Sequence, residues 1–387
     1  MSYKHLFSKS LSAAPDRLHM AAHSHHLWPD AARDGQAQAF EDAARLADDK
    51  WDHIFGEVYP AAQRYVANEL GLPDPSSIVF APNTHDLIVR LFSALDKTPI
   101  KLLTTDGEFH SMSRQRQRWE ESGRVIADII PVSPAETFDA RFMEAATHHD
   151  YDIIFTSHVF FNLGHIFGGL SELAELSRPD GPWVVIDGYH GFMAVPTDLS
   201  CVADKIFYLS GGYKYAMSGE GVCFMHAPHG YAPRPEITGW YAAFGDLVAP
   251  PKGGVGYTKD AGRFFGATFD PSGLYRFNAV RAMLTEQGLD TERMSQFVGG
   301  LQSQLASFIR KGKAGVLGTA RLLNNISAEH SARFLALDHE NAQSWKAELH
   351  AQNIITDVRG DVLRIGLGLY HDAEDIKRLC EAAKTLS

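Results

Sequence analysis

Short apolar runs separated by stretches with helical spacing dominate the middle of the chain. The runs at 153–155 and 184–186 are continuously apolar, as expected of strands that are buried on both faces. Strands that alternate with helices imply crossover connections, so we predict an α/β fold with a mainly parallel, seven-stranded sheet. The strands are expected at 78–80, 100–104, 125–131, 152–156, 183–186, 205–208 and 222–225.

The two ends of the chain carry a different pattern. Residues 30–70 place Ala, Leu, Trp and Phe at helical spacing among charges. Helical spacing of apolar residues resumes at residue 273, and segments of alternating apolar and polar residues at 332–337 and 362–367 predict a smaller α+β domain. We therefore predict a large domain of residues 50–272 and a small domain built from residues 1–49 plus 273–387. The Pro- and Gly-rich stretch at 227–256 is expected to be a functional or interfacial loop.

Composition narrows the classes of partner. The 387 residues include 36 basic and 47 acidic side chains, a net charge of −11 that disfavours nucleic acid and anionic lipid surfaces. The chain has no apolar run of the roughly 18–20 residues that cross a bilayer, and its start lacks a secretory apolar segment, so we expect a cytoplasmic protein. Three cysteines are too few for a disulfide framework and are expected to be reduced and buried.

Polar residues follow several predicted strands directly. Ser157 and His158 follow one strand, Asp187 ends the next, and the turn at 210–214 follows a third. Ligands of open α/β sheets bind beyond the carboxyl ends of the strands, so these residues are expected to share one crevice. Asp187 and Lys214 suit an aldehyde cofactor with a basic ring nitrogen, because the carboxylate keeps the ring protonated and the amine forms a Schiff base. Taken singly, the alternatives are a helix-capping Asp and a solvated surface Lys.

The motifs around this pair carry a family resemblance. Asp-Gly-Tyr-His at 187–190 and Gly-Tyr-Lys-Tyr at 212–215, followed by Ser-Gly-Glu-Gly at 218–221, resemble the pyridoxal phosphate site of fold-type I enzymes in the class V aminotransferase group. The Tyr before the Lys is most similar to kynureninase. The resemblance implies a fold-type I transferase-like architecture, pyridoxal 5'-phosphate as cofactor, and a homodimer with the active site at the interface. It also implies three catalytic residues: Lys214, Asp187 and His190.

Further motifs extend the resemblance over most of the chain. Ala-Pro-Asn-Thr-His-Asp-Leu at 81–87 is similar to the kynureninase phosphate turn, in which a helix start binds the anion, and Thr84 also suits a plain N-cap. Glu-Phe-His-Ser at 108–111 places Phe109 where the family stacks a flat side chain on the cofactor ring. Gly-Trp-Tyr at 239–241 and Arg-Phe-Phe-Gly-Ala-Thr at 263–268 resemble segments that reach the phosphate across the dimer. The implied cofactor contacts are Asn83, Thr84, His85, Phe109, Asp187, His190, Tyr213, Lys214, Trp240 and Thr268.

Substrate contacts come from the two ends of the chain and its centre. Arg364 lies in a segment at 362–370 similar to the one whose Arg clamps the substrate carboxylate, a role that suits a planar guanidinium. The alternative is an arginine on a surface strand. His-Ser-His-His at 23–26 and Phe-Phe at 160–161 replace the family's Asn-Ser-Leu-Gly and Asn-Tyr, so His26 and Phe161 are expected to reshape the pocket. The histidine run admits a pocket rim, a solvated loop or a metal site, and we predict no metal because carboxylate or cysteine partners at a recognisable spacing are missing.

These features predict a pyridoxal phosphate enzyme acting on an α-amino acid. The favoured reaction is kynureninase-like hydrolytic Cβ–Cγ cleavage of kynurenine or a related aromatic amino acid, with Lys214 as general base. The alternative is a class V aminotransferase, or another α- or β-reaction lyase on a small amino acid. Cysteine desulfuration is disfavoured because the segment 337–344 contains no cysteine to accept sulfur. Two readings of other classes are a cofactor-binding protein without turnover and a metal-dependent hydrolase.

Overall fold

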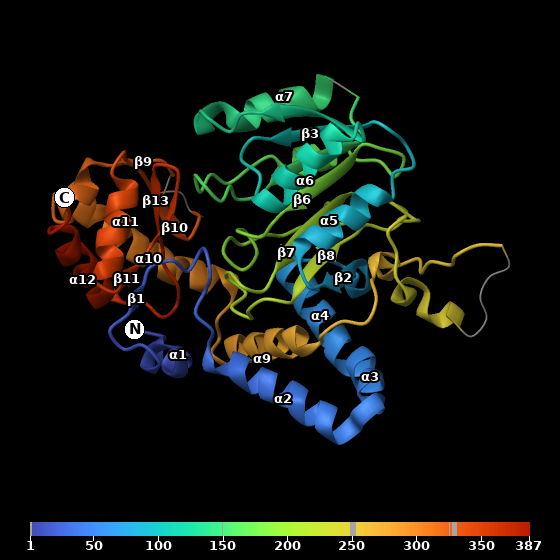
Figure 1. The fold of residues 1–387 in the computed structure, drawn as a ribbon, viewed down its shortest axis with the longest axis horizontal. Coiled ribbons are helices and arrows are strands. Elements are labelled where there is room, and N and C mark those ends of the chain that lie inside the picture. The colour runs from blue at the N-terminus through green and yellow to red at the C-terminus, as the bar shows by residue number, and fades with distance from the viewer. Residues whose placement is uncertain (1, 149, 248–252, 325, 327–330) are drawn as a thin grey trace.

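A seven-stranded sheet forms the centre of the molecule (Figure 1). The structure is a computed structural model that describes residues 2–148, 150–247, 253–324, 326 and 331–387. The strand order is β2-β8-β7-β6-β5-β3-β4, and all neighbours are parallel except β8, which runs antiparallel to both β2 and β7. The strands are β2 (Ile78–Ala81), β3 (Ile100–Thr105), β4 (Val125–Ile130), β5 (Ile153–Ser157), β6 (Trp183–Asp187), β7 (Ile206–Gly211) and β8 (Cys223–His226).

Helices cover both faces of this sheet and create two separate cores. Alternating side chains of β5 and β6 point to opposite faces, so that Ile154 and Val184 enter one core while Phe155 and Val185 enter the other. The first core also contains side chains of α4, α7 and α9, and the second contains side chains of α5 and α6. Because these strands are buried on both faces, their sequences are continuous apolar runs. The helices are α4 (Tyr59–Leu70), α5 (Thr84–Ser93), α6 (His110–Glu121), α7 (Phe138–His148), α8 (Leu170–Ala174) and α9 (Ser272–Glu286).

A second, smaller sheet carries the C-terminal part of the chain. Its order is β12-β13-β10-β9, all antiparallel, and α10, α11 and α12 bury its apolar face in a third core. The N-terminal segment joins this region because β1 pairs with β11, and α2 runs beside α9 (Figure 1). The elements are β1 (Leu18–His19), β9 (Arg321–Leu322), β10 (Phe334–Asp338), β11 (Ile354–Ile355), β12 (Asp357–Arg359), β13 (Val362–Gly366), α1 (Ser8–Ser12), α2 (Asp30–Leu46), α3 (Lys50–His53), α10 (Thr291–Arg310), α11 (Ala342–Ala351) and α12 (Ala373–Ala383). Short 3-10 or π turns are η1 (Lys4–Phe7), η2 (Ala47–Asp49), η3 (Ile54–Val58), η4 (Pro75–Ser77), η5 (Ala135–Thr137), η6 (Trp240–Leu247), η7 (Ala261–Phe264) and η8 (Gly315–Thr319).

The predicted fold class is confirmed. All seven predicted strands of the large sheet exist, and the segments predicted at 332–337 and 362–367 are β10 and β13. The pattern did not predict β1, β9, β11 and β12, because strands of two or three residues are too short to show a period. The boundaries 50–272 and 1–49 plus 273–387 stay a prediction. None of the helices in the described part of the chain has both the length and the apolar character needed to cross a membrane.

A buried arginine fixes the loop that follows β8. Arg263 is almost fully buried and donates to the carbonyls of Pro228, Tyr231 and Ala232 at 2.9–3.2 Å, and to the carbonyl of Asp260 at 2.6 Å. Burial lowers the pKa of the guanidinium to about 10, so it remains charged at neutral pH. The side chain therefore supplies donors to four carbonyl groups of this loop.

We predict that Arg263→Ala destabilises the protein by roughly 3 kcal/mol or more, because each buried acceptor left without a donor costs roughly 1–3 kcal/mol. The free energy of unfolding, from urea titration, measures the effect. The control is Arg33→Ala, whose side chain is 70% exposed and should change stability by less than about 0.5 kcal/mol. Equal stability of the two variants would show that Arg263 does not hold this loop.

Candidate functional site

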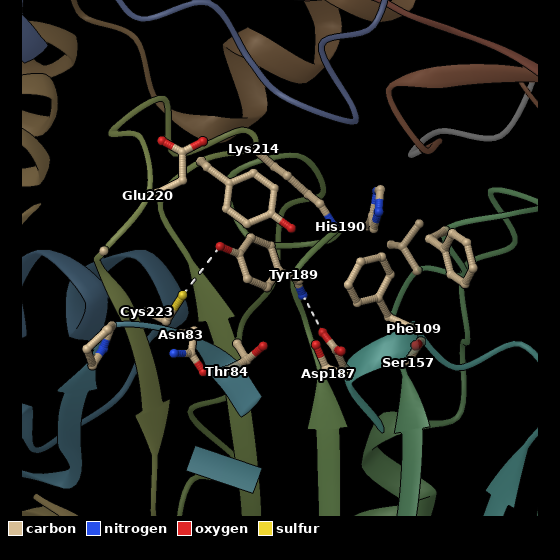
Figure 2. A pocket seen from close by; sticks show the side chains of 16 residues that line it. Asn83, Thr84, Phe109, Ser157, Asp187, Tyr189, His190, Lys214, Glu220 and Cys223 are labelled. Atoms are coloured by element: carbon tan, nitrogen blue, oxygen red, sulfur yellow. Dashed lines mark hydrogen bonds between the residues drawn. The ribbon is translucent and has the colours of Figure 1, made fainter. Parts of the chain in front are cut away.

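A cavity of about 190 Å³ opens at the carboxyl ends of β5, β6 and β7 (Figure 2). This is the edge of the sheet at which the sequence places its polar residues. Four segments meet there: the turn between β2 and α5, the turn before α6, the ends of β5 and β6, and the loop between β7 and β8. The lining residues are Pro82, Asn83, Thr84, Phe109, Ser111, Ser157, Val159, Phe161, Asp187, Tyr189, His190, Tyr213, Lys214, Glu220, Gly221 and Cys223.

Asp187 is the last residue of β6 and is held by the backbone that follows it. Its Oδ1 accepts the backbone N–H of Tyr189 at 2.9 Å, and Ser157 lies opposite it on β5. Burial raises the pKa of the Asp187 carboxyl, while the Tyr189 N–H and the nearby Lys214 charge act in the other direction. The carboxylate is thus poorly solvated and is stabilised by any cation that enters the cavity.

Lys214 lies in the tight turn after β7. The Ser218 N–H donates to the Gly212 carbonyl at 2.8 Å and closes this turn. The Lys214 Nζ lies 4.5 Å from the ring centre of Tyr189 and 5.3 Å from that of Phe109. Burial lowers the pKa of Lys214 to about 7, although Asp187 opposes the shift. The side chain is only 4% exposed, so the alternative of a solvated surface lysine is wrong.

The turn between β2 and α5 presents a helix start to the cavity. Asn83 is the N-cap of α5, and its Oδ1 accepts the backbone N–H of Asp86 at 2.9 Å. Thr84 begins the helix and is buried. The first N–H groups of a helix lack partners within the helix and carry the positive end of its dipole, so this turn favours an anion.

Aromatic rings form the wall opposite this turn. Phe109 precedes α6, and its ring centre lies 5.5 Å from that of Phe161 in an edge-on contact. His190 lies 6.5 Å from Phe161. Burial lowers the pKa of His190 well below its ordinary value, and the charges of Lys214 and Arg364 act in the same direction. His190 is therefore a neutral imidazole that can donate one hydrogen bond and accept another.

Arg364 lies next to the cavity and already binds groups of the protein. Its guanidinium is almost fully buried and donates to the carbonyl of Phe161 at 2.5 Å and to the carboxylate of Asp357. Arg359 contacts the same carboxylate at 2.9 Å. Two arginines thus share one aspartate, which leaves a net positive charge beside the cavity. The alternative of a surface arginine is wrong.

Three predicted cofactor contacts lie outside this cavity. His85 lines a neighbouring polar cavity between the starts of α5 and α6. Trp240 is 43% exposed and stacks on Tyr241 at 4.0 Å, and Thr268 is exposed beside the same Tyr241. Within one chain, none of the three lines the cavity that contains Lys214.

The N-terminal histidines contact the turn that carries Lys214, hereafter the lysine turn, from outside the cavity. The backbone N–H of His26 donates to the Tyr213 carbonyl at 3.1 Å, and the ring of His25 stacks on that of Tyr213 at 5.2 Å. The His26 side chain is buried beneath Tyr370 and does not line the cavity. Its Nδ1 is 2.8 Å from the carbonyl of Leu27, so the His26 side chain stabilises the N-terminal segment and does not contact the cavity. Among the described residues, no group of three or more His, Cys, Asp or Glu side chains is placed to hold a metal ion.

Glu108 is a site residue to which the sequence assigned no role. It is buried one residue before Phe109 and accepts hydrogen bonds from the hydroxyls of Thr105 at 2.6 Å and Ser157 at 2.7 Å. Burial raises the pKa of Glu108 to about 8, and the charge of Asp187 adds to the increase. At neutral pH the Glu108 carboxyl is therefore mostly protonated. The available signal was the acidic residue beside the predicted ring-stacking position.

The donor set fits pyridoxal phosphate. Asp187 would face the ring nitrogen, Lys214 would reach the aldehyde carbon, and Phe109 would lie against the ring. The helix start at Asn83 and Thr84 would hold the phosphate. The fit depends on the chemistry of the lining: one buried carboxylate, one amine with a pKa near 7 and one anion-binding turn meet in the same cavity.

Comparisons with solved structures identify proteins that have the same fold. Three solved structures share the fold at 15–17% identity. C-DES with glycine covalently linked to its pyridoxal phosphate cofactor has a TM-score of 0.82 and covers 100% of both chains. The complex of the cystine C–S lyase C-DES with its product cysteine persulfide has a TM-score of 0.79 and covers 97% of this chain and 99% of the other. The apo cysteine desulfurase of Thermococcus onnurineus has a TM-score of 0.80 and covers 99% of this chain and 98% of the other.

Sequence comparison identifies the family. A probable cysteine desulfurase of Mycolicibacterium paratuberculosis is 24% identical over 172 residues, which are 43% of this chain and only 25% of that protein. The family described as aminotransferase class-V matches residues 47–379. Together with the donor set, this match supports pyridoxal phosphate as the cofactor of this chain. The chain belongs to the class V aminotransferase family, as its motifs predict.

Proposed function

We propose that this protein is a pyridoxal phosphate-dependent lyase that breaks a bond at Cβ of an α-amino acid, with a C–S bond as the favoured target. The observation that carries the proposal is the burial of Asp187 and Lys214 in one cavity, which brings together a carboxylate for the ring nitrogen of the cofactor and a base for the Cα proton of the substrate. The similarity to a cystine C–S lyase and to cysteine desulfurases supports the same reaction class.

Each side chain has a distinct part in this chemistry. When bound, pyridoxal phosphate supplies an electron-withdrawing ring that acidifies the Cα proton of the amino acid. Asp187 would keep the ring nitrogen protonated, and Lys214, with a pKa of about 7, would accept the Cα proton. Within the described part of the chain, the Arg364 Nε has no hydrogen-bond partner, so it retains a donor for the substrate carboxylate. Phe109 and Phe161 exclude water from the reacting atoms.

The positions of the cysteines argue against a sulfur-carrying desulfurase. Cys380 is buried in α12, and Cys201 is exposed in a surface turn before β7. The expectation that all three cysteines are buried is wrong for Cys201. Cys223 lines the cavity at its phosphate end, and burial raises the pKa of its thiol to about 12, which leaves little nucleophilic thiolate. We infer that the sulfur product leaves the enzyme in diffusible form.

Hydrolysis of kynurenine is the second candidate. Phe109 and Phe161 give the cavity aromatic walls, which suit an anthraniloyl side chain. The neutral His190 beside Phe161 suits a hydrogen bond to a carbonyl group. The similarity to a cystine C–S lyase and to cysteine desulfurases favours C–S cleavage over this candidate.

We further propose a homodimer in which the segments of Trp240 and Thr268 complete the phosphate site of the other subunit. Both side chains are exposed, and neither lines the cavity of its own chain. Exposed aromatic side chains such as Trp240 and Phe244 are typical of protein interfaces. The partner is therefore a second copy of this chain.

Product analysis discriminates between the candidate reactions. Enzyme loaded with cofactor should convert L-cystine to pyruvate, ammonia and cysteine persulfide, without an added acceptor protein. The double variant Cys201→Ala/Cys380→Ala should keep this activity, because neither thiol takes part. Alanine and anthranilate from L-kynurenine, with no product from cystine, would instead establish the hydrolase. A keto acid formed only with an amino acceptor would establish the aminotransferase.

The pKa of Lys214 predicts how cofactor attachment depends on pH. Only the neutral amine attacks the aldehyde, and a pKa of about 7 leaves the amine mostly protonated below pH 6 and mostly neutral above pH 8. The rate of attachment to apoprotein should therefore rise with pH around a midpoint near 7. Borohydride trapping and mass spectrometry of the peptide that contains Lys214 measure it, with Lys214→Arg as the control. A midpoint near 10, or trapping at another lysine, would contradict the assignment.

Asp187→Asn should keep cofactor binding but lower kcat by about 100- to 1,000-fold, because a neutral amide does not stabilise the protonated ring. Titration with pyridoxal phosphate and steady-state kinetics separate the two effects. Ser157→Ala serves as the neighbouring control and should have a smaller effect, since it removes a hydrogen bond to Glu108 and leaves Asp187 in place. Undiminished turnover in Asp187→Asn would reject the role of this carboxylate.

A further inference from the structure

Tyr189 occupies a central place in the cavity that the catalytic scheme does not explain. Its side chain is only 7% exposed, and its ring centre lies 4.7 Å from that of Tyr213. The backbone N–H of Tyr189 donates to the Asp187 carboxylate, but the ring points away from that carboxylate. Figure 2 shows the ring extending across the cavity, with its hydroxyl directed toward Cys223.

The Tyr189 hydroxyl lies at the anion-binding end of the cavity. It is 3.4 Å from the Sγ of Cys223, and a backbone hydrogen bond from Thr84 reaches the same sulfur. Cys223 is fixed there because it pairs with Ala81 of β2 on one side and with Gly211 of β7 on the other. The hydroxyl is therefore a close neighbour of the helix start that Thr84 opens.

Gly211 leaves the space that this hydroxyl occupies. A Cβ at position 211 would lie 2.4 Å from the Tyr189 Oη and 2.4 Å from the Cys223 Sγ. Any side chain at this position would push the hydroxyl out of its place. The position of the Tyr189 hydroxyl thus depends on a glycine at position 211.

The hydroxyl is a neutral donor. Burial raises the pKa of Tyr189 well above its ordinary value, so the phenol keeps its proton. Its neighbour Cys223 is a weak acceptor, because a thiol forms poor hydrogen bonds. A phosphate group next to Thr84 would offer a much stronger, charged acceptor to the same O–H.

We propose that the Tyr189 hydroxyl donates a hydrogen bond to the phosphate of the cofactor, beside the helix start at Asn83 and Thr84. The proposal rests on pyridoxal phosphate being the cofactor. It adds a phosphate contact supplied by the chain itself, separate from those proposed for Trp240 and Thr268 of the partner subunit.

The test compares two ligands that differ only in the phosphate. Apoprotein is titrated with pyridoxal phosphate and with pyridoxal, and the dissociation constants are measured by absorbance. Tyr189→Phe should bind pyridoxal phosphate about 10- to 100-fold more weakly, the effect of losing a hydrogen bond to a charged group, and should bind pyridoxal within about 2-fold of the wild type. Tyr215→Phe is the matched control, because it removes a buried hydroxyl outside the cavity and should change neither constant.

A second variant displaces the hydroxyl instead of removing it, and retained binding of pyridoxal shows that each variant is folded. Gly211→Ala places a carbon 2.4 Å from the hydroxyl and should cause the same selective loss for pyridoxal phosphate. Equal weakening of both ligands in Tyr189→Phe, or no weakening, would overturn the proposal. Failure of the wild-type protein to bind either ligand would instead reject the cofactor assignment itself.

Discussion

The burial of a carboxylate and an amine in one small cavity is the constraint on which the rest of the structure depends. Asp187 and Lys214 come from the ends of the adjacent parallel strands β6 and β7, and water reaches neither freely. Each group loses hydration, so burial shifts the pKa of each toward its uncharged form. Both groups thus lose hydration free energy on folding, and a cofactor that binds both of them offsets part of that loss.

The surrounding elements maintain this pair. Backbone atoms approach closely at the strand ends, and a Cβ at Gly188 would lie 2.0 Å from the ring of Tyr208. The lysine turn is closed by its own backbone bonds and supported by the His26 N–H from the N-terminal segment. A residue far from the sheet in sequence therefore helps to hold the turn that carries Lys214. The mixed orientation of the sheet matters too, since the antiparallel β8 brings Cys223 beside the turn between β2 and α5.

The sequence predicts those features that short segments encode by themselves. The buried strands are visible because both faces are apolar, and Asp187 and Lys214 are visible because each follows such a strand. The pairing of Arg364 with Asp357 was not predictable, since it arises from the register of β12, a strand of three residues. The place of Cys223 likewise depends on neighbours that are distant in sequence. A single chain could not place Trp240, whose predicted contact belongs to a second copy.

The most direct test of the account is proton exchange at Cα. Cofactor-loaded enzyme is incubated in D₂O with a small α-amino acid such as L-alanine, and proton NMR follows the Cα resonance. Alanine has no leaving group at Cβ, so exchange reports proton transfer by the enzyme separately from any bond cleavage. The account predicts that the resonance disappears with the wild-type enzyme and persists with Lys214→Arg. Persistence with the wild-type enzyme, or exchange at an undiminished rate in the variant, would contradict the role of Lys214 at the centre of this site.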